Sequence, residues 1–189
     1  MKERYFGIVI VCIAGMISTI VTVGYHAGLR LNLTDSAPHG LWYVHILTTM
    51  TTIKRGELVE VCPPASSIVR LMAEQGHLSS GNCKDTKTTP LLKPISAIAG
   101  DVVQFKAGQP VTVNGITLPN TAAKKNIPCW AAGKYVVQAG EVWLFSSYSP
   151  NSFDSRYFGP VALSSVRGVA RAIAVNGNVA AITAGVIEQ

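Results

Sequence analysis

The chain has 189 residues, of which 48% are hydrophobic and only 14% charged, and its formal net charge at pH 7 is +6. This length suits one compact domain of roughly 160 residues besides a short apolar segment. The basic residues are dispersed, with no run longer than a pair such as Lys54-Arg55. Because nucleic-acid-binding surfaces usually show as basic clusters, the distribution argues against a DNA or RNA partner and favours a positive surface facing anionic lipid.

An uncharged stretch, 5–25, follows the basic residues Lys2 and Arg4. Its 21 residues are enough to cross the roughly 30 Å hydrocarbon core of a bilayer as a helix. The alternative is a cleaved secretory signal, whose apolar region is usually only about 7–15 residues and ends at an A-x-A-like site that is not evident here. We therefore expect a retained transmembrane anchor. More basic residues precede it than follow it, where Arg30 stands alone, which predicts a cytoplasmic N-terminus and an outer C-terminal domain.

Beyond the apolar stretch, short β-branched and aromatic runs are bounded by glycine, proline or polar turns, a pattern typical of β-strands. Asn114-Gly115 predicts a type I′ hairpin turn. One short helix is predicted over 66–76, where apolar residues recur at helical spacing before Gly76. The fold class is therefore mainly β with one short helix, preceded by a transmembrane helix. The predicted strands are 41–47, 57–62, 101–105, 110–115, 134–138, 141–145 and a closing strand 166–175.

The segment NLTDSAPHGLW, 32–42, is the first candidate for chemistry. Pro38 and Gly40 allow a rigid turn that holds the hydroxyl of Ser36 accessible. Thr34 could direct a second hydroxyl at a developing oxyanion, beside the backbone N–H of Ser36. The alternative interpretation is a plain polar turn between the anchor and the first strand.

A nucleophilic serine needs a base. None of the four histidines stands in a recognisable triad setting: His26, His39, His45 and His77. Lys93 is the only lysine in an apolar context, PLLKPISAIAGD, and burial there would lower the pKa of its amine toward the range in which it accepts a proton. The alternative is a strand lysine whose stem packs while its amine reaches water.

A third cluster, SYSPNSFDSRYFGPV, gathers Ser152, Asp154, Ser155 and Arg156 within five residues. Asp154 and Arg156 could pair across a turn and hold the loop rigid. Ser152 could hydrogen-bond the Lys93 amine and orient it. An ordinary polar loop accounts for the same residues.

In this order the three clusters resemble the signal peptidase superfamily. Type I signal peptidases have an anchor, a nucleophilic serine in a Ser-x-x-Pro setting, a general-base lysine followed by Gly-Asp, and a D-S-R-x-x-G segment. Here proline follows the serine at the second position instead of the third. This S-x-P-x-G-L-[WY] form, with PLLKPISAIAGD, EVWLFS and SFDSRYFGPV, resembles the TraF branch of conjugative-transfer peptidases. The matching residues are Ser36, Lys93, Gly100-Asp101, Asp154-Ser155-Arg156 and Gly159.

The resemblance implies a β-rich serine peptidase with a Ser36/Lys93 dyad and no metal or organic cofactor. It also implies that Thr34 is the side-chain oxyanion donor and that Ser152 orients the lysine. Asp154 and Arg156 of the third cluster are implied to support this catalytic site. The implied substrate is a pilin-like or signal-peptide-bearing precursor at the bacterial inner membrane, together with other conjugation or secretion components. Some members of the branch join the pilin ends into a ring.

The expected division of the chain is a cytoplasmic N-terminus (1–4), a transmembrane anchor (5–25), a periplasmic catalytic domain (26–175) and a tail without assigned structure (176–189). Two rival functions remain open at this point. One is a general signal peptidase acting on many exported proteins. The other is a non-catalytic, membrane-anchored assembly subunit, in which Ser36 and Lys93 would be dispensable.

The four cysteines show no C-x-x-C pair and no histidine at metal-ligand spacing, so a zinc site is not expected. Cys12 lies in the apolar stretch and is expected to be inert. Outside the cytoplasm one disulfide and one leftover cysteine are expected. The resemblance implies a pairing of Cys62 with Cys83, which leaves Cys129 as a small buried hydrophobic residue. The competing pairing joins Cys83 to Cys129.

Overall fold

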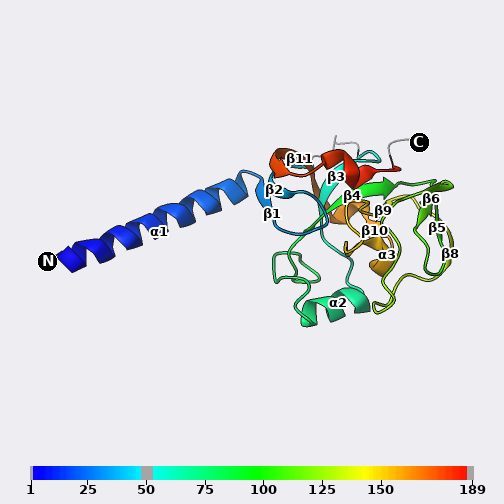
Figure 1. Ribbon diagram of the computed structural model, residues 1–189, viewed down its shortest axis with the longest axis horizontal. Coiled ribbons are helices and arrows are strands. Elements are labelled where there is room, and N and C mark those ends of the chain that lie inside the picture. Colours follow the sequence, from blue (N-terminus) through cyan, green and yellow to red (C-terminus); the bar gives the residue numbers. More distant parts are fainter. Residues whose placement is uncertain (1, 48–52, 187–189) are drawn as a thin grey trace.

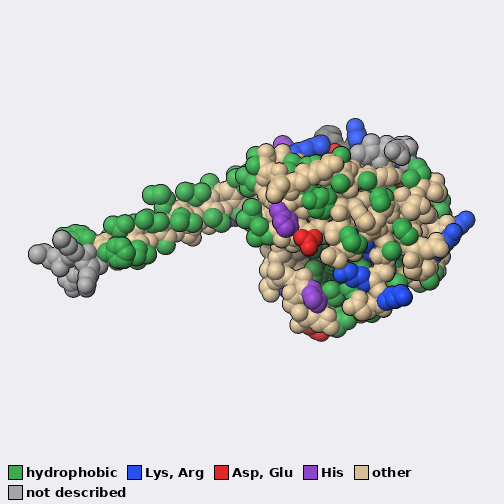
Figure 2. Space-filling model, viewed as in Figure 1, with side chains coloured by type: hydrophobic (Ala, Val, Ile, Leu, Met, Phe, Trp, Pro, Cys, Tyr) green, Lys and Arg blue, Asp and Glu red, His purple; other side chains and the backbone are tan. Residues whose placement is uncertain are grey.

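The computed structural model describes residues 2–47 and 53–186 (Figure 1). Helix α1, Lys2–His26, projects from one end of a β-rich body (Figure 1). Its apolar side chains are exposed along its length (Figure 2), and none of the span Tyr5–His26 is buried against the rest of the chain. The predicted apolar helix is therefore present, and it is long and apolar enough to cross a membrane.

The body consists of two antiparallel sheets. The larger sheet has the strand order β1-β2-β11-β3-β4-β9-β10, and the smaller has the order β7-β6-β5-β8. The prediction of a mainly β fold is thereby confirmed. The strands are β1 Leu29–Asn32, β2 His39–Ile46, β3 Leu58–Val61, β4 Leu91–Ala97, β5 Val102–Phe105, β6 Thr112–Val113, β7 Ile116–Thr117, β8 Gly133–Val136, β9 Glu141–Leu144, β10 Val161–Ala162 and β11 Val166–Asn176.

Each strand predicted from the sequence has a counterpart in the structure. Asn114 and Gly115 have φ angles of 51° and 86° and form the turn between β6 and β7, as the hairpin signal predicts. The predicted helix is α2, Ser67–Glu74, whose N-terminus is capped by the Ser66 side chain accepting from Val69 N at 3.4 Å. Gly76 follows with a φ of 76°.

Among the strands and α-helices of the described residues, β1, β4, β10 and the short helix α3, Ser155–Phe158, were not predicted. The omission of β4 has a specific cause. Pro94 lies inside it, and proline in a run normally argues against a central strand because it lacks an N–H for the ladder. The register of β4 against β9 shifts between Ile95 and Ala97, directly after Pro94. The central strand thus contains an irregularity next to its proline.

The C-terminal segment that was left unassigned packs onto the body. It contains the 3-10 helix η2, Val179–Thr183, and the side chains of Ile182 and Val186 are buried in two different parts of the core. Ser147 donates its backbone N–H to the Ile182 carbonyl at 3.1 Å. Residues 187–189 of the predicted tail lie outside the described residues.

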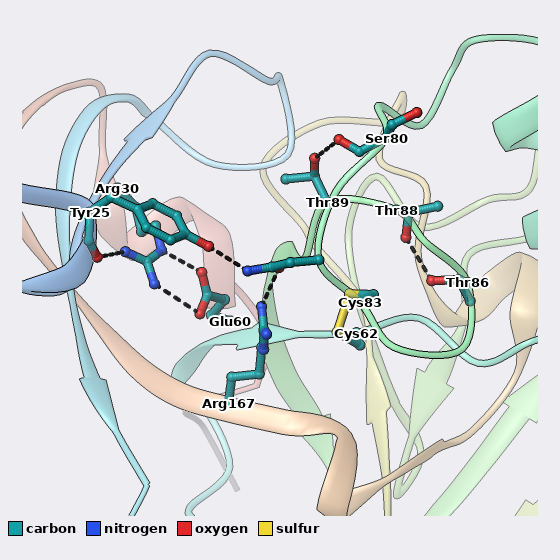
Figure 3. The surroundings of a disulfide bond; sticks show 11 residues. Tyr25, Arg30, Glu60, Cys62, Ser80, Cys83, Thr86, Thr88, Thr89 and Arg167 are labelled. Atoms are coloured by element: carbon teal, nitrogen blue, oxygen red, sulfur yellow. Dashed lines mark hydrogen bonds and ion pairs between the residues drawn. A yellow bond between two sulfur atoms is a disulfide. The ribbon is translucent and has the colours of Figure 1, made fainter. Parts of the chain in front are cut away.

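A disulfide joins Cys62, just after β3, to Cys83 in the long connection between α2 and β4 (Figure 3). This is the pairing implied by the family resemblance, and the competing pairing with Cys129 is wrong. Cys129 is free, but it is exposed and not buried as expected. It lies in an irregular segment before β8, in which Ile127 and Trp130 pack against the core while Cys129 is exposed.

Removing this disulfide is expected to lower the free energy of unfolding by about 3 kcal/mol, because the bond closes a loop of about twenty residues in the unfolded chain. Urea unfolding of the full chain in detergent, with both Cys62 and Cys83 replaced by serine, measures this. Cys129→Ser is the matched control and should leave the midpoint unchanged. A double variant as stable as the control would contradict the prediction.

Candidate active site

Ser36 lies in a turn between β1 and β2 that is organised by Asn32 at the end of β1. The Asn32 amide Nδ2 donates to the carbonyls of Thr34 at 3.1 Å, Ala37 at 2.9 Å and Pro38 at 3.1 Å. Its Oδ1 accepts from the Thr34 backbone N–H at 3.2 Å. Asn32 is buried, so these bonds fix the turn from inside and hold Ser36 in one place. This role was not predicted from the sequence, although asparagine side chains commonly organise the turns that follow them.

The Thr34 hydroxyl is engaged within the same turn. It donates to Asn32 Oδ1 at 2.8 Å, and the residue is exposed. In this conformation the hydroxyl hydrogen is directed at Asn32. The backbone N–H of Ser36, by contrast, has no hydrogen-bond acceptor within residues 2–47 and 53–186. It is therefore available as an oxyanion donor.

Lys93 lies on β4, the strand between β3 and β9 in the larger sheet, and its side chain contacts Ser36. Its Nζ is hydrogen-bonded to Ser36 Oγ and donates to Ser152 Oγ at 2.8 Å. Only 2% of Lys93 and 9% of Ser36 is exposed, so the contact lies in a largely water-free environment. The structure thus brings together three residues that are distant in the sequence: Ser36, Lys93 and Ser152.

The environment of Lys93 changes its protonation. Burial disfavours the charged ammonium and is the main reason why the pKa of Lys93 falls from 10.5 to about 8. The Asp154 carboxylate opposes this change, and the Arg156 guanidinium adds to it. The neutral form, which can accept a proton, is therefore a minor but accessible fraction of Lys93 near physiological pH, far larger than for an ordinary lysine.

Asp154 and Arg156 form a fully buried ion pair behind the dyad. Arg156 Nε donates to Asp154 Oδ1 at 2.8 Å and Nη2 donates to Oδ2 at 2.9 Å, so the pair is bidentate. The guanidinium also donates to the carbonyls of Asn120 at 2.9 Å and Ser146 at 3.1 Å. These bonds fix the loop that carries Ser152.

Ser146 connects this ion pair to the nucleophile and was not identified from the sequence. Its backbone N–H donates to Asp154 Oδ2 at 3.1 Å, and its hydroxyl donates to the Ser36 carbonyl at 2.6 Å. The residue is fully buried and lies two residues after the end of β9. Ser146 therefore holds the Ser36 backbone against the Asp154 loop. A single serine after a strand gives no sequence signal for a contact across 110 residues.

The other candidate groups lie elsewhere. His39 is exposed, with its Nε2 3.3 Å from Asp35 Oδ1, and within the described part of the chain no histidine is hydrogen-bonded to Ser36. Asp101 pairs with Arg55 at 2.5 Å and accepts from Asn114 Nδ2 at 2.9 Å, so the Gly-Asp motif stabilises a turn away from the dyad. Among the described side chains, no three His, Cys, Asp or Glu converge in a way that could hold a metal ion.

A cleft of about 680 Å³ runs from the dyad to the end of α1. Ser36 and Lys93 lie on its surface with the Ser36 turn, and apolar side chains from β4 and the neighbouring loops form much of the rest. Its volume suits an extended peptide segment of a few residues. The apolar lining residues include Leu31, Leu33, Leu78, Leu91, Leu92 and Phe153.

Comparison with known proteins agrees with the motifs. The family described as signal peptidase, peptidase S26, matches residues 2–175. The chain is 32% identical to the plasmid transfer protein TraF of Escherichia coli over 92% of this chain and 96% of that protein. It is 35% identical to the conjugal transfer protein TraF of Agrobacterium fabrum over 85% and 91%. A signal peptidase I of Enterococcus faecalis matches in structure with a TM-score of 0.38 and 18% identity, covering 64% of this chain and 98% of that one. Because the family match spans nearly the whole chain and the TraF relatives align over most of their length, the chain belongs to the signal peptidase family, peptidase S26, and is homologous to TraF conjugal transfer proteins.

Proposed function

We propose that this chain is a membrane-anchored serine endopeptidase in which Ser36 is the nucleophile and Lys93 the general base, and that it processes a pilin precursor during conjugative transfer. One observation carries the proposal: the buried Lys93 amine, with its lowered pKa, is hydrogen-bonded to the Ser36 hydroxyl at the wall of a cleft. The conjugal transfer names of the full-length relatives support the choice of pathway.

In the first half of the reaction, neutral Lys93 accepts the Ser36 hydroxyl proton while Ser36 Oγ attacks the scissile carbonyl carbon. The developing oxyanion is stabilised by the Ser36 backbone N–H, and the Thr34 hydroxyl is a second donor if it rotates away from Asn32. The Lys93 ammonium then gives its proton to the departing amine. The C–N bond breaks and an acyl ester forms on Ser36.

In the second half, Lys93 is neutral again and removes a proton from water or from an incoming amine, which attacks the ester carbonyl. The C–O bond to Ser36 breaks, and Lys93 returns a proton to Ser36 Oγ. Water releases a linear product. An amine at the other end of the same substrate would instead release a ring, which is lighter than the linear product by one water molecule.

The anchor has a physical role in this scheme. We infer that α1 crosses the inner membrane with its N-terminus in the cytoplasm, so that residues 26–175 form a periplasmic catalytic domain. An enzyme and a precursor held in the same bilayer meet at a high effective concentration without any added contact. Such placement brings the dyad close to the membrane surface where exported substrates emerge.

Mass spectrometry of the precursor tests the function. Membrane vesicles carrying the full chain, supplied with the pilin precursor of the same conjugation system, should yield a product cleaved at one site, and vesicles with Ser36→Ala should not. Equal cleavage of several unrelated exported preproteins would instead favour a general signal peptidase. Processing that is unchanged by Ser36→Ala would favour a non-catalytic assembly role and overturn the proposal.

The pH dependence of processing is expected to report Lys93. Below its pKa of about 8 the amine is mostly protonated and cannot act as a base, so kcat/KM should rise with pH and level off above about 8. Below the midpoint the expected slope is about tenfold per pH unit, as for one titrating group. His39→Ala and His77→Ala should not shift this profile. A midpoint near 6.5 that disappears in either variant would identify a histidine base instead.

A further inference from the structure

The cleft loop, residues 75–90 between α2 and β4, forms one wall of the cleft and has little regular structure. It contains one isolated bridge, Ser80 with Thr88, and few buried apolar side chains apart from Cys83. A segment with so little buried apolar area depends on specific ties to hold one position. The residues of the loop that line the cleft are His77, Leu78, Gly81, Asn82, Thr89 and Pro90.

Asn82 supplies such a tie with both ends of its amide. Nδ2 donates to Tyr25 Oη at 2.7 Å, and Oδ1 accepts from Arg167 Nη1 at 2.6 Å. Tyr25 lies in the last turn of α1, and Arg167 lies on β11. The neighbouring Cys83 is covalently bound to Cys62 after β3. One short stretch of the loop is thus fixed to the N-terminal helix and to the main sheet.

Further contacts close a ring that includes the disulfide (Figure 3). Arg30 Nη1 donates to the Tyr25 carbonyl at 2.7 Å, and its guanidinium lies 4.1 Å from the centre of the Tyr25 ring. Arg30 Nε donates to Glu60 Oε1 at 2.6 Å, and Glu60 stands on β3, two residues before Cys62. The ring therefore runs from α1 through β1 and β3 to the disulfide, and returns through Asn82 to α1.

We propose that Arg167 and Asn82 are positioning residues that set the width of the substrate cleft by fixing the cleft loop against the end of α1. This inference rests on the proposed function, in which the cleft receives the precursor. Asn82 and Tyr25 line the cleft, whereas Arg167 is not among the described residues that line it. Arg167 therefore influences substrate only by holding Asn82. Without it the loop moves outward, and the substrate binds less tightly while the dyad keeps its geometry.

Arg167→Met in the full chain in detergent tests this. With a peptide spanning the precursor cleavage site, KM is expected to rise about three- to tenfold with kcat nearly unchanged, as for the loss of one solvent-exposed hydrogen bond. Arg167→Lys should recover part of the affinity. The matched control is Arg171→Met, also on β11, where the side chain is 65% exposed and outside the cleft. An unchanged KM in Arg167→Met, or an equal rise in the control, would overturn the inference.

Two further measurements separate this inference from the proposed function. The small ester p-nitrophenyl acetate acylates Ser36 through the dyad but is too small to fill the cleft. Its rate of acylation should therefore be the same in Arg167→Met and wild type. If wild type is neither acylated nor active on the peptide, the proposed function fails and hydrogen exchange decides the inference. Faster amide exchange confined to residues 75–90 in Arg167→Met supports it, and exchange identical to that of Arg171→Met overturns it.

Discussion

Replacement of Lys93 by methionine is expected to reduce the rate of precursor processing by about a thousandfold or more. The variant keeps an unbranched apolar stem in the buried site but removes the only amine in contact with the Ser36 hydroxyl among the described residues. General-base removal typically costs about 10²–10⁴ in rate, and an uncharged serine hydroxyl is a weak nucleophile on its own.

Because the two groups act as one unit, Ser36→Ala should be as inactive as Lys93→Met, and the double variant should be no worse than either. Lys134→Met, on the exposed surface of β8, is the matched control and should keep full activity. Urea unfolding of each variant verifies that it folds. Retention of more than about a tenth of the wild-type rate by folded Lys93→Met would argue against the dyad.

Arg156→Met is expected to destabilise the fold by about 3–5 kcal/mol, the usual cost of breaking a buried ion pair from one side. Asp154 is 0% exposed and would lose its bidentate partner, and the carbonyls of Asn120 and Ser146 would lose their donor. Urea unfolding of the full chain in detergent measures the change.

The control for this prediction is Arg171→Met, which also removes an ion-paired arginine. Its side chain is 65% exposed and 3.4 Å from Glu57, so solvent already screens the pair and the expected loss is within about 1 kcal/mol. Equal effects of the two variants would mean that the buried pair does not stabilise the loop. Because Ser146 joins Asp154 to the Ser36 carbonyl, Arg156→Met should also lower the processing rate of the molecules that remain folded.

Several properties of this protein follow from local sequence alone. The uncharged stretch 5–25 predicts α1 because a helix that crosses lipid needs only length and apolar composition. Strand positions follow from β-branched runs, and the hairpin turn follows from the positive φ that Asn114 and Gly115 tolerate. The motif order around Ser36 and Lys93 was sufficient for the family, which the comparisons confirm.

Only the tertiary structure decided how these parts meet. β11 inserts between β2 and β3, and β4 becomes a central strand despite Pro94, because strand order depends on long-range pairing that no short pattern encodes. The same holds for the site. Ser36 meets Lys93 across 57 residues and Ser146 across 110, and the Thr34 hydroxyl turns to Asn32. The lowered pKa of Lys93 also arises here, since desolvation depends on the atoms that surround the amine in space and not on its neighbours in sequence.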